Sequence, residues 1–169
     1  QSKKEYVIDW KETKVYPYAV NLFDDKELIK HIAGCDFVFG CVDTIDGRNL
    51  LNQISTFYLI PYIDIGVHLE SDGKGGIEVI YYVVQYIQPG GSSLLSRKVY
   101  SNEELRAASL LRNAPEEYQR QKKVGYIADL NLENPAVISF DMQSATVAVN
   151  EFLARIHPFR YDDNSKYAI

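Results

Sequence analysis

The sequence has little cysteine, no long apolar run and no excess of basic residues. Its two cysteines, Cys35 and Cys41, cannot form the framework of several disulfides found in small secreted proteins, which favours a reducing cytoplasm. The longest strongly apolar stretch, residues 77–87, is shorter than the roughly 20 residues that a membrane helix needs, so we expect no membrane segment. The net charge of −5, with acidic and basic residues interspersed, argues against a nucleic-acid partner.

Methionine is also scarce, and this bears on where the chain starts. The first residue is Gln1 and the single methionine is Met142, so we expect the N-terminus of a fragment or of a processed or trimmed protein. A chain of 169 residues, of which 46% are hydrophobic, can bury one core. We therefore predict a single domain over residues 1–169, with a frayed tail over the polar residues 161–169.

Strand-like and helical patterns alternate in the first part of the chain. Runs typical of strands cover residues 15–22, 37–42 and 61–66. Asp24 with Glu27 three residues later makes a capping-box pattern, which predicts a helix that ends at Gly34. A second helix is expected after Asp43. Strands that alternate with helices indicate a parallel α/β sheet.

The pattern changes after residue 66. Residues 71–76 predict a turn that leads into a β-rich run over residues 77–88, so we expect an antiparallel hairpin. Residues 97–124 are polar, have a break at 113–115 and predict a mobile excursion. A final helix from near Asp141 is expected to pack on the sheet through Ala145, Ala148, Val149, Phe152 and Ile156. We therefore predict an α/β fold: a partial Rossmann-like sheet whose parallel strands are extended by an antiparallel hairpin, with helices packed on the sheet.

Asp43 is the most informative polar residue, because it stands where the predicted buried strand 37–42 gives way to a helix. Ligands of open α/β sheets bind beyond the carboxyl ends of the strands, and a carboxylate there can hold Mg²⁺ against the phosphates of a nucleotide. The alternative is that Asp43 caps the helix, and spacing alone leaves both roles open. In the first role, Asp43 should follow a central parallel strand and face an open crevice.

The spacing of Asp43, Arg48 and Asn52 resembles that of ThiF/MoeB/HesA-type adenylating domains. In these domains an Asp after a strand is followed five residues later by Arg and nine later by Asn, the intervals found here. Further segments of the same domains resemble residues 20–28, 60–66 and 134–139. The resemblance extends from about residue 15 to about residue 159. It implies that this chain is the C-terminal portion of such a domain, without the N-terminal glycine-rich nucleotide loop.

The resemblance implies an activity, its cofactors and its partners. Such domains bind ATP and Mg²⁺ and adenylate the C-terminal Gly-Gly carboxylate of a ubiquitin-like or sulfur-carrier protein. Asp43 would then hold the metal, Arg48 would orient its loop, and Asn52 would contribute to nucleotide binding. Phe23 and Asp24 would lie near the adenine. The resemblance also implies a homodimer, and without the anion-binding loop we expect the isolated chain to be inactive.

The sequence departs from the family at two places. Ser93 and Ser96 stand where many members carry Cys-x-x-Cys, and because serine is a poor zinc ligand we expect no zinc site. The excursion 97–124 has no cysteine that could form a thioester, and Cys41, inside a predicted buried strand, is expected to be inert. We therefore assign no nucleophile.

Two other functions stay open on the sequence. A non-catalytic ThiF-like scaffold is compatible with Ser93 and Ser96 and with the lack of a cysteine in the excursion. A nicotinamide-dependent oxidoreductase is the weaker alternative. It would need a glycine fingerprint and an acidic residue that contacts the ribose, and the sequence shows neither.

Overall fold

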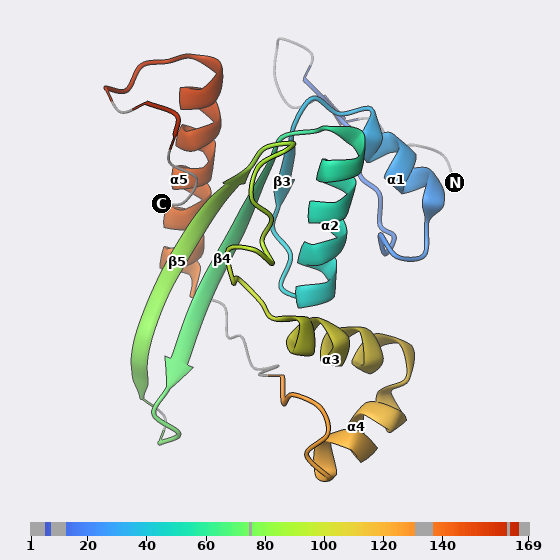
Figure 1. Cartoon of the computed structure of the whole chain (residues 1–169). Helices are drawn as coiled ribbons and strands as arrows, with labels where there is room; N and C mark the ends of the chain where they lie inside the picture. Colours follow the sequence, from blue (N-terminus) through green and yellow to red (C-terminus); the bar gives the residue numbers. More distant parts are fainter. Residues whose placement is uncertain (1–5, 8–12, 75, 131–136, 162, 166–169) are drawn as a thin grey trace. The chain divides into compact units, whose positions relative to one another are not determined.

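The computed structural model describes residues 6–7, 13–74, 76–130, 137–161 and 163–165. The chain falls into two compact units, residues 1–34 and residues 35–169. The second unit contains the sheet and the helices packed on it (Figure 1). That the whole chain forms a single domain stays a prediction.

The first unit contains less strand than the sequence predicts. A short antiparallel pair joins β1, Tyr6–Val7, to β2, Lys14–Val15. The strand expected over residues 15–22 is therefore wrong beyond Val15, because the residues that follow form turns and irregular backbone. Exposed side chains such as Tyr16 and Val20 lack the burial that stabilises an extended segment in a sheet.

The first helix, α1, spans Lys26–Ala33 and ends at Gly34 as predicted. Its N-terminal cap is Asp25 rather than Asp24. The Asp25 carboxylate accepts hydrogen bonds from the backbone N–H of Glu27, at 2.9 Å, and of Leu28. Asp24 and Asp25 are neighbours, so the sequence pattern alone does not show which of them caps the helix. Asp25 is the cap because its backbone is extended and its carboxylate accepts from the N–H groups of the first turn.

The sheet of the second unit has the order β3-β4-β5. Its strands are β3, Val38–Gly40; β4, Tyr62–Ser71; and β5, Ile77–Ile87. β3 and β4 are parallel, whereas β4 and β5 form a long antiparallel hairpin. The α/β class and the hairpin that extends the parallel pair are thus confirmed.

β3 differs from the buried central strand that we predicted over residues 37–42. Among the described strands it pairs only with β4, so it is an edge strand, and Phe39 on it is 41% exposed. Cys41 follows the strand and is exposed, so its expected burial inside the strand is also wrong. Both differences follow from the absence of a second neighbour on this side of the sheet, among the strands described.

Two helices cover opposite faces of β4. On one face, Asp64 contacts α2, Ile45–Tyr58. On the other face, Ile63 packs with Val84 against Ala148 of α5, Ile138–Ile156. Successive residues of a strand point to opposite faces, which is why Ile63 and Asp64 meet different helices. Figure 1 shows α2 and α5 flanking the two long strands.

The polar stretch predicted as an excursion forms two helices, α3, Asn102–Asn113, and α4, Pro115–Lys123. The predicted break lies between them. Their shared core consists of Ala107, Ala108, Tyr118 and Leu130. An ion pair of 2.7 Å between Arg112 Nε and Asp46 Oδ2 connects α3 to the first turn of α2. The mobility of this stretch stays a prediction.

The face of α5 that packs on the sheet is partly the one predicted, because Ala148 is buried there and Phe152 packs against the same core. Its buried residues are Ser144, Ala148, Glu151 and Ala154. Of the residues expected to pack inward, Val149 is 49% and Ile156 51% exposed. The small side chain of Ala148 allows close packing against the sheet, whereas these larger apolar side chains turn outward. None of the helices in the described part of the chain has the length and apolar character that crossing a membrane requires.

Candidate functional site

A pocket of about 380 Å³ lies beyond the carboxyl end of β3. β3 ends at Gly40, which pairs with Asp64, whereas β4 continues to Ser71. The pocket occupies the space beside β4 that β3 does not reach. Four segments line the pocket: Cys41, Val42 and Asp43 after β3; Arg48 of α2; Ile65, Gly66, Val67 and Leu69 of β4; and Asp141, Ser144 and Ala145 of α5. This is the position at which open α/β sheets bind ligands.

Asp43 lies in this pocket with an exposed side chain. Its carboxylate makes no hydrogen bond or ion pair with any described residue. The cap of α2 is Thr44, whose hydroxyl accepts a hydrogen bond of 3.3 Å from Gly47 N–H. The structural alternative for Asp43, that it caps the helix, is therefore wrong, and its carboxylate is available to a ligand. The strand that it follows is the edge strand β3 rather than a central one.

Arg48, one turn into α2, forms a buried ion pair with Asp64 of β4. Its Nε donates to Asp64 Oδ1 at 3.0 Å, and its Nη2 donates to Oδ2. The Asp64 side chain is fully buried, and it also accepts a 2.6 Å hydrogen bond from the hydroxyl of Tyr62. This bidentate ion pair joins the first turn of α2 to the sheet. The segment that carries Asp43 directly precedes that turn.

Two glycines make room for this cluster. A Cβ at Gly66 would lie 3.0 Å from Arg48 Nη2, and a Cβ at Gly40 would lie 2.5 Å from the ring of Tyr62. Real Cβ contacts of 2.5 Å do not occur, so a side chain at Gly40 would displace the buried tyrosine. The glycines of β3 and β4 are therefore part of the architecture that seats Arg48 and Tyr62 against Asp64.

The titration behaviour of the cluster points to a positioning role. Burial alone lowers the pKa of Arg48, but the hydrogen bonds and the charge of Asp64 outweigh burial and raise this pKa overall. Burial, and then the Asp64 carboxylate, raise the pKa of Tyr62 far above its ordinary value. Burial also raises the pKa of the neighbouring Tyr100, to about 12. Arg48 therefore stays charged and the tyrosines stay protonated near neutral pH, so these groups orient the site rather than exchange protons.

Cys41 lines the same pocket, but its thiol is a poor nucleophile. Partial burial raises the pKa of Cys41, and the carboxylates of Asp64 and Asp43 raise it further. A thiol with a raised pKa is mostly protonated at neutral pH, and only the thiolate attacks efficiently. The physical reason differs from the strand burial that we predicted.

The remaining predicted site residues are Asn52, Phe23 and Asp24. Asn52 is buried outside the pocket, and its Oδ1 accepts a 2.9 Å hydrogen bond from Leu94 N–H, which connects α2 to the loop after β5. Phe23 and Asp24 belong to the unit formed by residues 1–34. The nucleotide contacts predicted for these three residues stay predictions.

Three residues of the site were not predicted from the sequence: Asp64, Asp141 and Ser144. Asp64 had a signal, because it is a charged residue inside an otherwise apolar strand, and a buried carboxylate normally has a partner. Asp141 and Ser144 line the pocket from the first turns of α5, and the Ser144 hydroxyl donates to the Asp141 carbonyl at 2.9 Å. No local pattern indicates that this helix end meets the segment after β3.

The described part of the chain contains no group of three or more His, Cys, Asp or Glu side chains placed to share a metal ion. A metal at Asp43 would therefore take most of its ligands from phosphate oxygens and water. This is the usual mode of Mg²⁺ binding, through one or two carboxylates.

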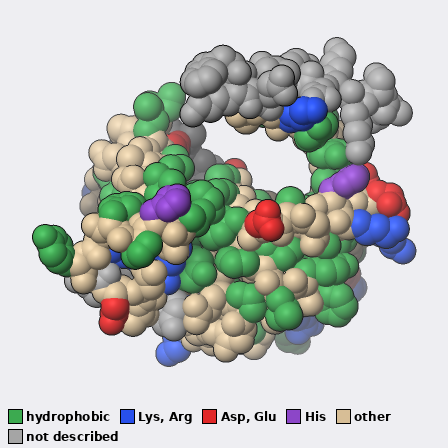
Figure 2. Space-filling view, turned by 90° about the horizontal axis from the view of Figure 1, so that it is seen from above, with side chains coloured by type: hydrophobic (Ala, Val, Ile, Leu, Met, Phe, Trp, Pro, Cys, Tyr) green, Lys and Arg blue, Asp and Glu red, His purple; other side chains and the backbone are tan. Residues whose placement is uncertain are grey.

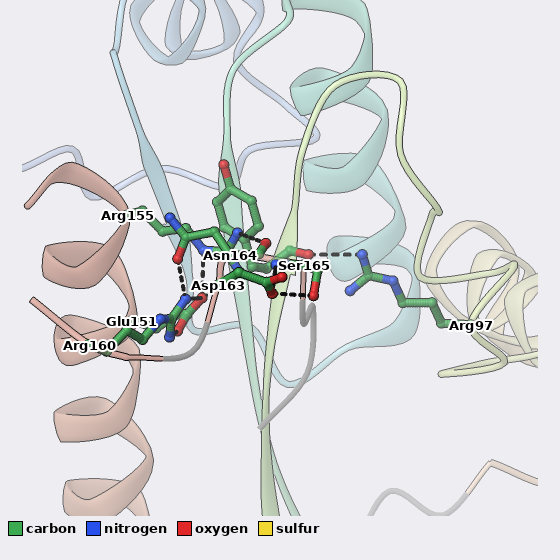
Figure 3. A network of polar contacts seen from close by, with 8 residues as sticks. Arg97, Glu151, Arg155, Arg160, Asp163, Asn164 and Ser165 are labelled. Carbon is green, nitrogen blue, oxygen red and sulfur yellow. Dashed lines mark hydrogen bonds and ion pairs between the residues drawn. The ribbon is translucent and has the colours of Figure 1, made fainter. Parts of the chain in front are cut away.

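A second polar cluster, away from this pocket, joins α5 to residues that follow it (Figure 3). Glu151 of α5 accepts from Arg155 Nε at 2.6 Å and also from Arg160. Arg155 Nη1 donates to the carbonyl of Asn164 at 2.7 Å, and Arg160 Nη2 donates to its Oδ1 at 2.6 Å. The guanidinium of Arg155 lies 3.9 Å from the ring centre of Tyr86. Asn164 is thus bound to α5, and the fraying of residues 161–169 stays a prediction.

This cluster predicts a pH-dependent contribution to stability. Burial alone raises the pKa of Glu151, but hydrogen bonds from Arg160 and Arg155 outweigh it and lower this pKa below its ordinary value. A lowered carboxyl pKa stabilises the fold above the unfolded-state pKa, and this contribution is lost as pH falls through the folded-state pKa. We expect Glu151→Gln to cost roughly 1.5–3 kcal/mol at neutral pH, and less as the pH approaches about 3.

Urea unfolding between neutral pH and about pH 3 measures this difference. Glu103→Gln, at an exposed position in the first turn of α3, is the matched control and should leave the pH profile of the wild-type protein unchanged. A Glu151→Gln variant whose stability loss is the same at all pH values would contradict the assignment of this carboxylate to the ion pairs.

Comparison with known proteins adds no relative. The chain matches no protein-family model, and searches of curated proteins and of solved structures find no match either.

Proposed function

We propose that the pocket beside Asp43 receives the phosphates of ATP with their Mg²⁺, and that the chain is the C-terminal part of a ThiF/MoeB/HesA-type adenylating domain. The observation that carries this proposal is the carboxylate of Asp43, which is exposed and without a partner among the described residues. It stands in a pocket beyond the carboxyl end of a parallel strand. The buried carboxylates in the described part of the chain are paired, whereas Asp43 in the pocket is open to a cation.

The residues present are compatible with such a group. Mg²⁺ favours one or two carboxylates together with phosphate oxygens, and Asp43 supplies a carboxylate that is free to bind. Asp141 places a second acidic residue in the lining of the pocket. A volume of about 380 Å³ is within the range of small-molecule sites and accommodates part of a nucleotide. When bound, the metal would neutralise phosphate charge during adenylation.

In this proposal Arg48 acts on the position of Asp43 rather than on the phosphates. Its guanidinium is committed to Asp64 by two hydrogen bonds, and its side chain is only 18% exposed. The ion pair fixes the first turn of α2 to β4, and the segment 41–44 leads directly into that turn. We therefore assign Arg48 the role of a positioning residue, which is the role expected from the resemblance.

The same proposal assigns the partner and the compartment. The substrate would be the C-terminal Gly-Gly carboxylate of a ubiquitin-like or sulfur-carrier protein, adenylated in the cytoplasm. The second candidate function is a non-catalytic scaffold of the same fold. It is favoured by the sequence of residues 97–124, which contains no cysteine that could receive an activated partner as a thioester. A scaffold would bind its partner without turning over ATP.

ATP–pyrophosphate exchange distinguishes the two. We expect this chain alone to exchange little, because no glycine-rich phosphate loop is present in its sequence. A longer form that carries such a loop before Gln1 should gain exchange in the presence of its carrier protein and Mg²⁺. A longer form with an intact loop that binds its carrier protein but exchanges no pyrophosphate would favour the scaffold.

A further inference from the structure

The first turn of α2 is held from a second side, by the helix pair α3–α4. Asp46 lies in this turn with a side chain that is 9% exposed, and its Oδ2 accepts a 2.7 Å hydrogen bond from Nε of Arg112. Arg112 belongs to the last turn of α3. Figure 1 shows α3 beside the end of α2 at which that helix begins. The ion pair therefore joins two helices through residues that lie 66 positions apart in the sequence.

Apolar packing and a further hydrogen bond support the same junction. Ile45, the first residue of α2, packs against the core that α3 and α4 share. Asn49, one turn further along α2, accepts a 3.1 Å hydrogen bond at its Oδ1 from the hydroxyl of Tyr100. Tyr100 is buried and immediately precedes the N-terminal cap of α3. The start of α2 is thus fixed to the helix pair at three of its residues.

The junction continues from Asp46 to the lining of the pocket. The second carboxylate oxygen of Asp46, Oδ1, accepts a 3.0 Å hydrogen bond from Gly47 N–H. Gly47 packs tightly against the segment before the helix, because a Cβ at this position would lie 2.6 Å from Cγ1 of Val42 and 2.7 Å from the Thr44 hydroxyl oxygen. Val42 lines the pocket and directly precedes Asp43. Closely packed atoms transmit a displacement, so a shift of the first turn of α2 moves Val42 and with it Asp43.

We propose that Arg112 is a positioning residue for the pocket beside Asp43, acting through Asp46, Gly47 and Val42. Neither Arg112 nor Asp46 lines the pocket, so their effect on it is one of position. The helix pair α3–α4 is then part of the support of the site, on the side of α2 that the sheet does not hold. This inference rests on the proposed function, because the carboxylate that it positions is the one that would hold the metal.

Hydrogen–deuterium exchange of the chain itself tests the structural half of the proposal. In Arg112→Met, the backbone N–H groups of Gly47 and Arg48 should exchange faster by roughly 2- to 30-fold, because the first turn of α2 has lost one of its two ion pairs. Amides of the hairpin formed by β4 and β5 should keep their wild-type rates. This measurement does not depend on what the pocket binds.

The Mg²⁺ dependence of ATP–pyrophosphate exchange tests the functional half, in a longer form that carries a glycine-rich loop. Arg112→Met should raise the Mg²⁺ concentration for half-maximal exchange by roughly 2- to 30-fold. Loss of a cation near the pocket would by itself favour Mg²⁺ and lower this concentration, so the direction separates position from charge. A mere loss of stability would lower the maximal rate instead. Arg112→Lys keeps a charged donor and should stay close to the wild-type protein.

A double-mutant cycle tests the route through Asp46. Asp46→Asn removes the charge that holds Arg112, so the addition of Arg112→Met to this variant should change the Mg²⁺ dependence little further. Gly47→Ala tests the last step independently, because its methyl group would displace Val42. We expect this variant, too, to raise the Mg²⁺ concentration for half-maximal exchange.

Two controls change comparable groups outside the junction. Arg120 of α4 is 77% exposed and pairs with Glu117 of its own helix, so Arg120→Met removes an ion pair that does not reach α2. Hydrophobic side chains occupy a large part of the face seen in Figure 2. One exposed hydrophobic side chain of α2 is Phe57, which is 79% exposed and lies roughly 16 Å along the helix from Asp46. Arg120→Met and Phe57→Ser should leave both measurements unchanged.

Unchanged amide exchange in Arg112→Met would overturn the coupling between α3 and the pocket. Faster amide exchange with an unaltered Mg²⁺ dependence would overturn the positioning role, and additive effects of Asp46→Asn and Arg112→Met would overturn the route through Asp46. If the longer wild-type form exchanged no pyrophosphate at all, the proposed function would fail. Faster amide exchange in Arg112→Met would then still support the coupling.

Discussion

Asp43→Ala, in a longer form of the protein that carries a glycine-rich loop, is expected to reduce ATP–pyrophosphate exchange by roughly 10²-fold or more. Asp43 is the only acidic residue of the segment 41–44, and its carboxylate has no partner among the described residues. Its removal therefore eliminates the proposed metal ligand without breaking an internal contact. The free energy of unfolding should change by less than about 0.5 kcal/mol, as for other exposed substitutions.

The matched control is Asp36→Ala. Asp36 is an exposed aspartate that precedes β3 and does not line the pocket, so its replacement should leave exchange unchanged. Titration with Mg²⁺ separates a metal ligand from a general charge effect, because Asp43→Ala should raise the Mg²⁺ concentration needed for half-maximal exchange. If Asp43→Ala left exchange undiminished, the catalytic assignment of this residue would be wrong.

Asp64→Ala is expected to destabilise the protein by about 3–5 kcal/mol, the largest effect on stability that we predict. The substitution leaves the Arg48 guanidinium, which is mostly buried, without its counter-charge. It also leaves the Tyr62 hydroxyl, in a fully buried side chain, without its acceptor. Urea unfolding at neutral pH measures the loss from the midpoint and the slope.

The double variant Arg48→Met/Asp64→Leu distinguishes a charge effect from a packing effect. Replacing both members of a buried ion pair by apolar residues of similar size is often close to neutral, so the double variant should recover most of the lost stability. A loss of less than about 1 kcal/mol for Asp64→Ala would be typical of an exposed ion pair and would contradict the burial of this one. If the double variant folds but lowers ATP–pyrophosphate exchange in the longer form of the protein, the loss would indicate that Arg48 positions the site.

Local signals in the sequence were enough to place several elements. Glycine at residue 34 ended α1 because it follows the last helical turn, and the turn at 71–76 joined two strands rich in β-branched and aromatic residues. The break at 113–115 was readable because proline is tolerated at the start of a helix but not inside one. These features depend on the backbone preferences of a few neighbouring residues.

Local sequence signals predicted only part of the candidate site. The position of Asp43 after a strand was local information, and the exposed carboxylate in a pocket agrees with it. The pairing of Arg48 with Asp64 joins residues that are far apart in the sequence, and no pattern in one sequence specifies such a partner. The same holds for Asp141 and Ser144, which reach the pocket only because α5 lies beside β4.

The alternation of strands and helices, the α/β class and the hairpin are properties of the sequence alone, because they follow from periodicity and turn residues within short windows. Long-range packing was needed to establish which face of α5 meets the sheet, that β3 is an edge strand among those described, and that Asp64 is a partner of Arg48. Periodicity in the sequence showed that α5 has an apolar stripe, which includes Val149, Phe152 and Ile156. Periodicity does not show which surface covers the stripe. Which surface covers it depends on the competition among all the groups that the chain can bury, including the paired charges of Glu151 and Arg155.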